Sequence, residues 1–342
     1  MKLPPLISVP LSWLYGMVVH IRHKLFDLKI LRSEEFDIPV VCIGNLTVGG
    51  TGKTPVAELL IERFSEHYRV GVLSRGYRRR TKGFVLSTPT SSARTIGDEP
   101  RQMKLKYPSV PVAVCEKRAE GIRLLRKAHP EIELIILDDA FQHRYVEPWV
   151  NILLMDYNNP VYRDRLLPWG RLRDTRNQIH RANFVLVTKC PDDLNPLDMR
   201  IVINSLGLFP YQSLYFTRMR QGEITPLFAD RAVGKVREGD PVIAMSGIAN
   251  PVPLLENLRK RFDVVAELTF DDHHTYRLSD MRRLEALFAA YPDAVVLTTE
   301  KDAVKLTNRK KVPEAVQQRL YYVPIHVSFV ADSESEFLRQ LE

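Results

Sequence analysis

The segment GNLTVGGTGKTP, Gly44 to Pro55, constrains the fold of this chain more than any other feature. It follows a short β-branched run, IPVVCIGN, and precedes a helical pattern, PVAELLIERFSEHY. Strand, glycine-rich loop and helix form the setting of the phosphate-binding loop, G-x-x-x-x-G-K-[ST]. Gly52, Lys53 and Thr54 fit this pattern, but Thr47 stands where its first glycine belongs. The segment therefore predicts a nucleotide site with an unusual entry turn, in which Gly44 takes the role of the missing glycine.

The chemistry of the loop agrees with this prediction. Its later glycines let the backbone approach an anion and turn N–H groups toward it. We expect Lys53 to reach the β- and γ-phosphates and the Thr54 hydroxyl to bind Mg²⁺. Pro55 is tolerated because the first N–H groups of a helix have no intrahelical partner. A plain glycine-rich turn is the alternative. The residues predicted to bind the nucleotide are Thr47, Val48, Gly49, Gly50, Thr51, Gly52, Lys53 and Thr54.

Further strand and helix patterns alternate after the loop. RVGVLSRGY, VPVAVC, ELIILDD and ANFVLVTK are predicted strands, and KRAEGIRLLRKA is a predicted helix. This alternation favours an α/β fold with a P-loop NTPase-type parallel sheet flanked by helices. Ligands of such sheets bind at the carboxyl ends of the strands, where Asp138 and Asp139 follow an apolar run. Their carboxylates are the hard oxygen ligands that Mg²⁺ requires.

Other polar clusters lie in predicted loops. GDEP places Asp98 and Glu99 together, and FQHRY places Gln142 and His143 directly after the two strand-end acids, where we expect them near the metal. The arginine-rich segments 74–83 and 163–176 are either solvated faces or a basic rim for an anionic substrate.

The pattern weakens between about 206 and 236 and then resumes. Residues 213–226 resemble a hairpin linker with Gln221-Gly222 near its turn, and 227–342 reads as a smaller C-terminal α/β domain after a P-loop domain at 36–212. The loop DDHHTY, Asp271 to Tyr276, interrupts this second domain. Adjacent histidines rarely share one zinc ion. A core-capping role and a catalytic role facing the cleft between the domains both stay open for them.

Residues 1–35 are predicted to form an amphipathic, membrane-associating segment. Apolar side chains recur at three- and four-residue steps from Leu11 to Leu28, and His20, His23, Lys24 and Asp27 fall on the opposite face. Such a helix can lie in the plane of a membrane surface, or its stripe can pack on the protein's own core. The formal net charge of +8 favours an anionic partner.

Eight motifs occur in the order in which they appear in one known family. They are GNLTVGGTGKTP, LSRGY, GDEP, LDDAFQHR, LPWGRLRD, SGIANP, DDHHTY and TEKDAVK. Over roughly residues 5 to 330 the chain resembles the tetraacyldisaccharide 4'-kinase (lipid A 4'-kinase) family, whose phosphate loop also carries Thr at the position of Thr47. The resemblance implies an enzyme on the cytoplasmic face of the inner membrane of a Gram-negative bacterium, and we expect it to be a monomer. It would transfer the γ-phosphate of ATP, with Mg²⁺, to the 4'-hydroxyl of tetraacyldisaccharide 1-phosphate and form lipid IV-A.

The resemblance also assigns roles to single residues. It implies Asp98 and His273, the latter preceded by Asp272, as the pair that acts on the sugar hydroxyl, with Lys53 on the phosphates. The implied metal ligands are Thr54, Glu99, Asp138 and Asp139, and the weaker substrate contacts are Asn45, Arg75, Gln142, His143, Arg173 and Asp174. Two positions depart from the family: Ala140 replaces a glycine, and Asp174 replaces a glutamate.

Two other classes of protein stay open on the residues alone. One is a P-loop ATPase or GTPase of another kind, such as a metallochaperone. A GTPase would carry [NT]-K-x-D after a strand, but TKCPDD has Pro191 at the position of that Asp, so ATP is favoured. The other is a nucleic-acid-binding ATPase, which no recognition motif supports. We therefore expect a lipid-linked disaccharide and an anionic membrane surface as partners, and no nucleic acid.

Overall fold

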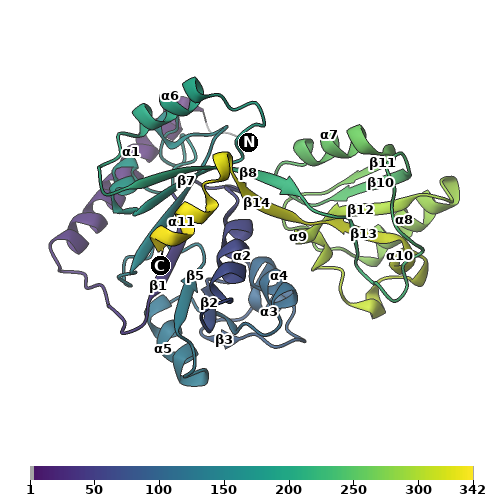
Figure 1. Ribbon diagram of the computed structural model, residues 1–342, viewed down its shortest axis with the longest axis horizontal. Helices are drawn as coiled ribbons and strands as arrows, with labels where there is room; N and C mark the ends of the chain where they lie inside the picture. The colour runs from purple at the N-terminus through teal and green to yellow at the C-terminus, as the bar shows by residue number, and fades with distance from the viewer. Residues whose placement is uncertain (1–3, 342) are drawn as a thin grey trace.

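The computed structural model describes residues 4–341, which form two α/β sheets with a helix at the N-terminal end (Figure 1). Residues 1–3 and 342, at the outer ends of the predicted 1–35 and 227–342 segments, lie outside the described residues. The predicted fold class is confirmed, because the larger sheet is mostly parallel and the smaller sheet is mixed.

The strand that leads into the phosphate-binding loop lies near the centre of the large sheet. Its spatial order is β14 (Ile325–Phe329), β8 (Ser213–Gln221), β7 (Phe184–Thr188), β6 (Val150–Asp156), β1 (Val40–Asn45), β5 (Leu134–Leu137), β2 (Val70–Ser74), β4 (Val112–Val114) and β3 (Val85–Leu86). All neighbouring pairs are parallel except β14 with β8 and β3 with β4 at the two edges. The carboxyl ends of β1, β5, β2 and β7 therefore meet along one edge of the sheet.

Both faces of this sheet are buried, which explains why its strands read as continuous apolar runs. Val41 and Ile43 of β1 belong to one core cluster, and Val40 and Cys42 belong to another on the opposite face. The first face is covered by α2 (Lys53–Phe64), α4 (Asp98–Lys106) and α11 (Glu334–Leu341), and the second by α5 (Arg118–Ala128) and α6 (Pro196–Leu206).

The small sheet forms a second module with its own two-sided core. Its order is β11 (Asp263–Thr269), β10 (Pro241–Ser246), β12 (Val295–Thr299), β13 (Leu320–Val323) and β9 (Thr225–Pro226). One face packs on α8 (Leu278–Ala290) and α10 (Glu314–Arg319), and the other on α7 (Val252–Arg261). The remaining short helices are α3 (Ala93–Ile96), α9 (Glu300–Ala303), η1 (Val161–Arg163), η2 (Arg176–Arg181), η3 (Arg309–Lys311) and η4 (Val330–Asp332).

The predicted hairpin at 213–226 is wrong. Strand β8 pairs with β7 and β14 in the large sheet, whereas β9 pairs with β13 in the small one. The N–H of Gly222 donates to the carbonyl of Pro324, so this segment turns toward a strand that is distant in sequence rather than toward its neighbour. Strand β14 and helix α11, inside the predicted 227–342 domain, return to the large sheet, and the chain thus passes twice between the modules (Figure 1).

Helix α1 (Pro5–Asp27) packs on the protein with its polar side. Ser8, Ser12 and His23 are buried, and the Ser12 hydroxyl donates to the Leu166 carbonyl at 2.9 Å. In contrast, most of the predicted apolar stripe faces outward, with Val18 59% exposed. Among residues 4–341 no helix is long and apolar enough to cross a membrane.

Candidate active site

The phosphate loop ends in a left-handed glycine that starts helix α2. Gly52 has φ +85° and directly precedes Lys53, the first helical residue, and Gly49 has φ +113°. The helix thus begins two residues before the predicted start at Pro55. Pro55 is nevertheless tolerated, because it still lies among the first N–H positions, which have no intrahelical acceptor.

Thr47 fits because the loop is held by a neighbouring strand-like segment instead of a tight turn. Thr47 pairs with Leu172 in an isolated antiparallel bridge, and the Val48 N–H donates to the Arg171 carbonyl at 2.8 Å. The position that requires glycine is Gly44, where a Cβ would lie 2.6 Å from the Cβ of Phe141.

Lys53 lies in a polar cluster at the carboxyl ends of β1 and β5. Its ammonium is 3.5 Å from Asn45 Oδ1 and 3.9 Å from Asp139 Oδ1. Arg173 donates to both carboxylate oxygens of Asp139 and to the carbonyl of Asn45. Burial opposes ionisation, but the charges of Lys53 and Arg173 lower the pKa of Asp139 to about 2. This cluster is therefore charged at neutral pH and lies beside the loop.

Asp138 is the neighbouring acid, and its surroundings are different. It is 4% exposed, its Oδ2 accepts from the Ser74 hydroxyl at 3.0 Å, and its Oδ1 has no hydrogen-bond partner. Burial and the charge of Asp139 raise its pKa to about 6, and Glu99 adds to this effect. A buried carboxylate oxygen without a donor is suited to a cation.

The His273 loop of the small module reaches the first turn of α4 in the large one. His273 Nδ1 lies 2.8 Å from Asp98 Oδ2, and both side chains are nearly buried. Burial favours the neutral acid, but the hydrogen bond from His273 and the positive charges of Lys305 and Lys301 lower the pKa of Asp98. The predicted pair of acid and histidine, 175 residues apart, is thus in hydrogen-bond contact.

The second histidine of the loop has a structural environment. The ring of His274 stacks on Phe270 with centroids 4.3 Å apart, and its Nε2 lies 3.0 Å from Asp280. Of the two histidines, only His273 points toward the large module.

Comparison with known proteins identifies the family that carries this arrangement. The family model described as tetraacyldisaccharide-1-P 4'-kinase (LpxK) matches residues 5–342. A tetraacyldisaccharide 4'-kinase of Bacteroides thetaiotaomicron is 45% identical over 341 residues, covering 96% of this chain and 90% of that protein. One of Parabacteroides distasonis is 44% identical over 340 residues, covering 97% and 92%. The chain belongs to the tetraacyldisaccharide 4'-kinase family. Its function is therefore that of a 4'-kinase in lipid A biosynthesis, as the motifs predicted.

A solved structure of a 4'-kinase supports the same assignment. The LpxK of Aquifex aeolicus, crystallised in complex with ATP, is 26% identical with a TM-score of 0.75, covering 97% of each chain.

Two of the predicted residues of this 4'-kinase, Asp174 and His143, have their contacts outside the Lys53 cluster. Asp174 is 1% exposed and lies 2.6 Å from His23 Nε2 of α1. His143 accepts from the Arg118 N–H at 3.2 Å, and burial lowers its pKa to about 4. Arg75 is exposed. Gln142, however, stays close, because its amide donates to the Asn45 carbonyl at 2.5 Å.

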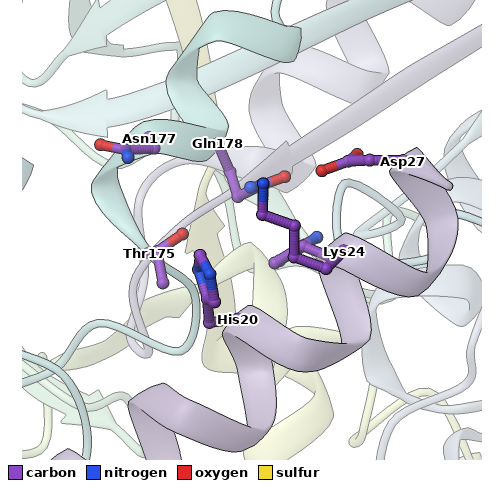
Figure 2. Close-up of a pocket in the computed structure, with 7 residues that line it drawn as sticks. His20, Lys24, Asp27, Thr175, Asn177 and Gln178 are labelled. Carbon is purple, nitrogen blue, oxygen red and sulfur yellow. The ribbon is translucent and has the colours of Figure 1, made fainter.

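A cavity of about 280 Å³ separates α1 from the segment that begins at Thr175 (Figure 2). His23, which pairs with Asp174, also lines it. The side chains labelled in Figure 2 are His20, Lys24, Asp27, Thr175, Asn177 and Gln178.

The departure at Ala140 causes no backbone strain in this 4'-kinase. The left-handed residue of the LDDA turn is Asp139, with φ +48°, whereas Ala140 is buried and donates to the Ile43 carbonyl at 3.0 Å. An added methyl group is therefore accommodated in the core.

Sequence reasoning missed Lys189 at the end of β7. Its ammonium donates to the Gly50 carbonyl of the phosphate loop and to Asp156 Oδ2 at 2.8 Å. The sequence signal is the strand-end lysine of TKC, which the comparison with a GTPase motif does not connect to the phosphate-binding loop.

Proposed function

We propose that this 4'-kinase transfers the γ-phosphate of ATP to the 4'-hydroxyl of tetraacyldisaccharide 1-phosphate at the carboxyl edge of the large sheet. The hydrogen bond between Asp98 and His273 carries this proposal, since it brings an ionised carboxylate from one module into contact with an imidazole from the other, next to Glu99, whose charge reaches Asp138. Phosphoryl transfer needs positioning and charge neutralisation more than covalent chemistry. The arrangement offers both.

The loop from Thr47 to Thr54 would hold the phosphates of ATP. Its glycines present backbone N–H groups, α2 directs its positive dipole end toward the loop, and Lys53 adds a full charge. Arg173 and Asn45 keep Asp139 in place beside Lys53. Lys189, which already contacts the Gly50 carbonyl, would order the loop from the β7 side.

Asp98 would accept the proton of the 4'-hydroxyl. A sugar hydroxyl is a weak nucleophile, so a base within hydrogen-bond reach accelerates attack. The lowered pKa of Asp98 keeps it ionised at neutral pH, and the His273 imidazole orients it through Nδ1–H. Because the two groups come from different modules, the base is complete only when the modules meet, which would limit hydrolysis of ATP by water.

The donor set fits Mg²⁺. Thr54, Glu99 and Asp138 supply hard oxygens, and Asp138 Oδ1 is a buried acceptor without a partner. Asp139 is already paired with Arg173 and Lys53, so Asp138 is the stronger candidate of the two acids. Within the described residues no three or more His, Cys, Asp or Glu side chains gather into a metal cage. Bound Mg²⁺ would neutralise charge on the phosphates, whose oxygens commonly complete its coordination.

The acceptor's four acyl chains suggest that the enzyme acts at a membrane surface, and α1 fits that role. Its outward face is apolar, and its inward face contacts the active-site segments. The Tyr15 hydroxyl donates to the Arg173 carbonyl at 2.7 Å, and Arg22 donates to the Gln142 carbonyl at 2.9 Å. A helix embedded in the cytoplasmic surface of the inner membrane would thus present the lipid's sugar to this edge of the sheet. We propose a peripheral, monomeric enzyme.

Transfer of phosphate from ATP to tetraacyldisaccharide 1-phosphate in detergent micelles, with and without Mg²⁺, tests this function. Asp98→Asn and His273→Ala should each lower kcat by about 10²- to 10⁴-fold. His129→Ala, at a half-buried histidine of the α5 end that takes no part in the proposed site, is the matched control and should keep wild-type turnover. Unchanged kcat in either of the first two variants would refute the role given to that residue.

A further inference from the structure

The TEKDAVK segment brings a lysine to the active-site histidine, and the mechanism above does not use it. Lys301 Nζ lies 3.4 Å from His273 Nε2 and 3.4 Å from Asp272 Oδ1. We infer that Lys301 is a positioning residue, which holds the His273 imidazole in the one tautomer and orientation that donate to Asp98. This inference rests on the proposed role of the Asp98–His273 pair.

The base of the segment is rigid, so the lysine starts from a fixed point. Asp302 is fully buried and accepts from the Gly247 N–H, the Thr299 hydroxyl and the Lys305 ammonium, each at 2.8 Å. These contacts tie α9 to the carboxyl ends of both β10 and β12. Lys301 therefore extends from a short helix whose placement two strands determine.

The donor inventory of the two side chains selects the tautomer. An ammonium can only donate hydrogen bonds. His273 Nε2, which faces Lys301, must therefore be the acceptor, and the ring proton must sit on Nδ1, 2.8 Å from the carboxylate of Asp98. The opposite tautomer would set an N–H against the ammonium and a bare nitrogen against the Asp98 carboxylate, and Asp272 Oδ2, 3.6 Å from Nε2, lies too far away to accept that proton in a hydrogen bond. Both contacts would be repulsive, so Lys301 and Asp98 favour the same state from opposite sides of the ring.

The backbone of His273 makes such support necessary. His273 has φ +62°, a left-handed conformation that is strained for a residue with a side chain, and its N–H contacts the Gly247 carbonyl only at 3.3 Å. The nearest aromatic ring, that of Tyr77, is 5.7 Å away and more than half exposed. The loop alone thus holds the imidazole weakly, and the polar contacts at its two nitrogens must determine its orientation.

Lys301 also contacts acidic residues of both modules. Besides Asp272 and His273 in its own module, it lies 3.5 Å from Glu99 Oε1 of α4. About a quarter of its side chain is exposed. One lysine thus contacts the histidine, the acid before it in sequence and the acid that follows Asp98.

Two substitutions of Lys301 test the inference, with turnover and the tautomer as separate measurements. Lys301→Met keeps the length of the side chain but removes its charge and its hydrogen-bond donors. Lys301→Arg keeps the charge and the donors. Lys260→Met, an exposed lysine on α7, is the matched control. Nitrogen-15 NMR of histidine-labelled protein in micelles reports the tautomer, and the His273 signals are assigned by their loss in His273→Ala.

We expect the Nδ1–H tautomer for His273 in the wild-type protein and in the control. Lys301→Met should show a mixture of tautomers and a kcat lowered by about 10- to 100-fold, with KM for ATP within about twofold. Lys301→Arg should recover most of the Nδ1–H tautomer and most of kcat. In a His273→Ala background, Lys301→Met should cause no further loss of kcat. A raised KM for ATP with unchanged kcat would overturn the inference in favour of a phosphate-binding lysine.

Failure of the inference can be told apart from failure of the proposed function. If His273→Ala keeps full turnover, the proposed pair is wrong whatever Lys301 does. If His273→Ala abolishes turnover while Lys301→Met keeps both the tautomer and kcat, only the positioning role is refuted.

Discussion

The outward apolar face of α1 leads to a quantitative prediction about membrane binding. Leu6, Leu14 and Val18 lie on this face and are 88%, 55% and 59% exposed. Replacing all three with serine should weaken binding to vesicles without affecting the fold, because none of them is a core residue of the protein.

The magnitude follows from the exposed area. Complete burial of such a side chain is worth about 1.5–3 kcal/mol. On average about two-thirds of these side chains is available to the membrane, so each substitution should cost about 1–2 kcal/mol and the three together about 3–6 kcal/mol. Since about 1.4 kcal/mol corresponds to a factor of ten, partitioning should fall by at least about 100-fold.

Sedimentation with vesicles of mixed zwitterionic and anionic lipid measures this partitioning, and thermal unfolding monitors the fold. Val252→Ser with Leu278→Ser, two apolar residues of the small module that are 53% and 57% exposed, form the matched control and should bind like wild type. Binding that stays within about twofold of wild type in the triple variant would refute the role of the face. A fall in Tm of about 4 °C or more would show instead that the stripe stabilises the protein's own core.

Three further predictions concern buried or half-buried groups. His23→Ala leaves the Asp174 carboxylate buried without its partner, so the free energy of unfolding should fall by about 3–5 kcal/mol, measured as a lower urea midpoint. Burial, with a contribution from nearby Glu300, raises the pKa of Glu58 from 4.5 to about 7. The folded protein therefore holds this proton more tightly than the unfolded chain, and the associated stability is complete below pH 4.5 and lost as the pH rises through 7. Glu58→Gln cannot ionise, so its stability relative to wild type should rise between about pH 5 and about pH 8, by at most about 3 kcal/mol, and a constant difference across this range would contradict the assignment. His274→Phe keeps the stacking on its aromatic neighbour, so its kcat should stay within about twofold of wild type, and a loss as large as that of His273→Ala would show that the wrong histidine was chosen.

The sequence predicted local features of this fold well, because each depends on nearby residues. The loop around Lys53, the parallel strands and the acids at the end of β5 all follow from apolar runs, glycines and polar strand ends. The pairing of Asp98 with His273 was available only through the family resemblance. No spacing rule connects two residues that are 175 positions apart.

What the sequence did not predict depends on long-range pairing. The alternating pattern of β8 is compatible with a hairpin. In the structure, however, β8 pairs with β14, which follows Pro324 about 100 residues later in the chain. The stripe on α1 is equally compatible with a core and with a membrane. Its orientation is determined by Ser12 and His23, polar residues whose partners lie more than 150 positions away.

The return of the chain to the large sheet has a consequence for synthesis on the ribosome. Strand β14 and helix α11 are translated after the entire small module, yet Val327 and Phe337 belong to the core cluster that packs against helix α2. During elongation the small module can close on its own, while the larger core stays open on its α2 side until these C-terminal segments emerge. A nascent chain halted near residue 324 would therefore carry every residue of the phosphate loop but lack the packing that supports it, and we expect such a chain to depend on chaperones rather than to bind ATP.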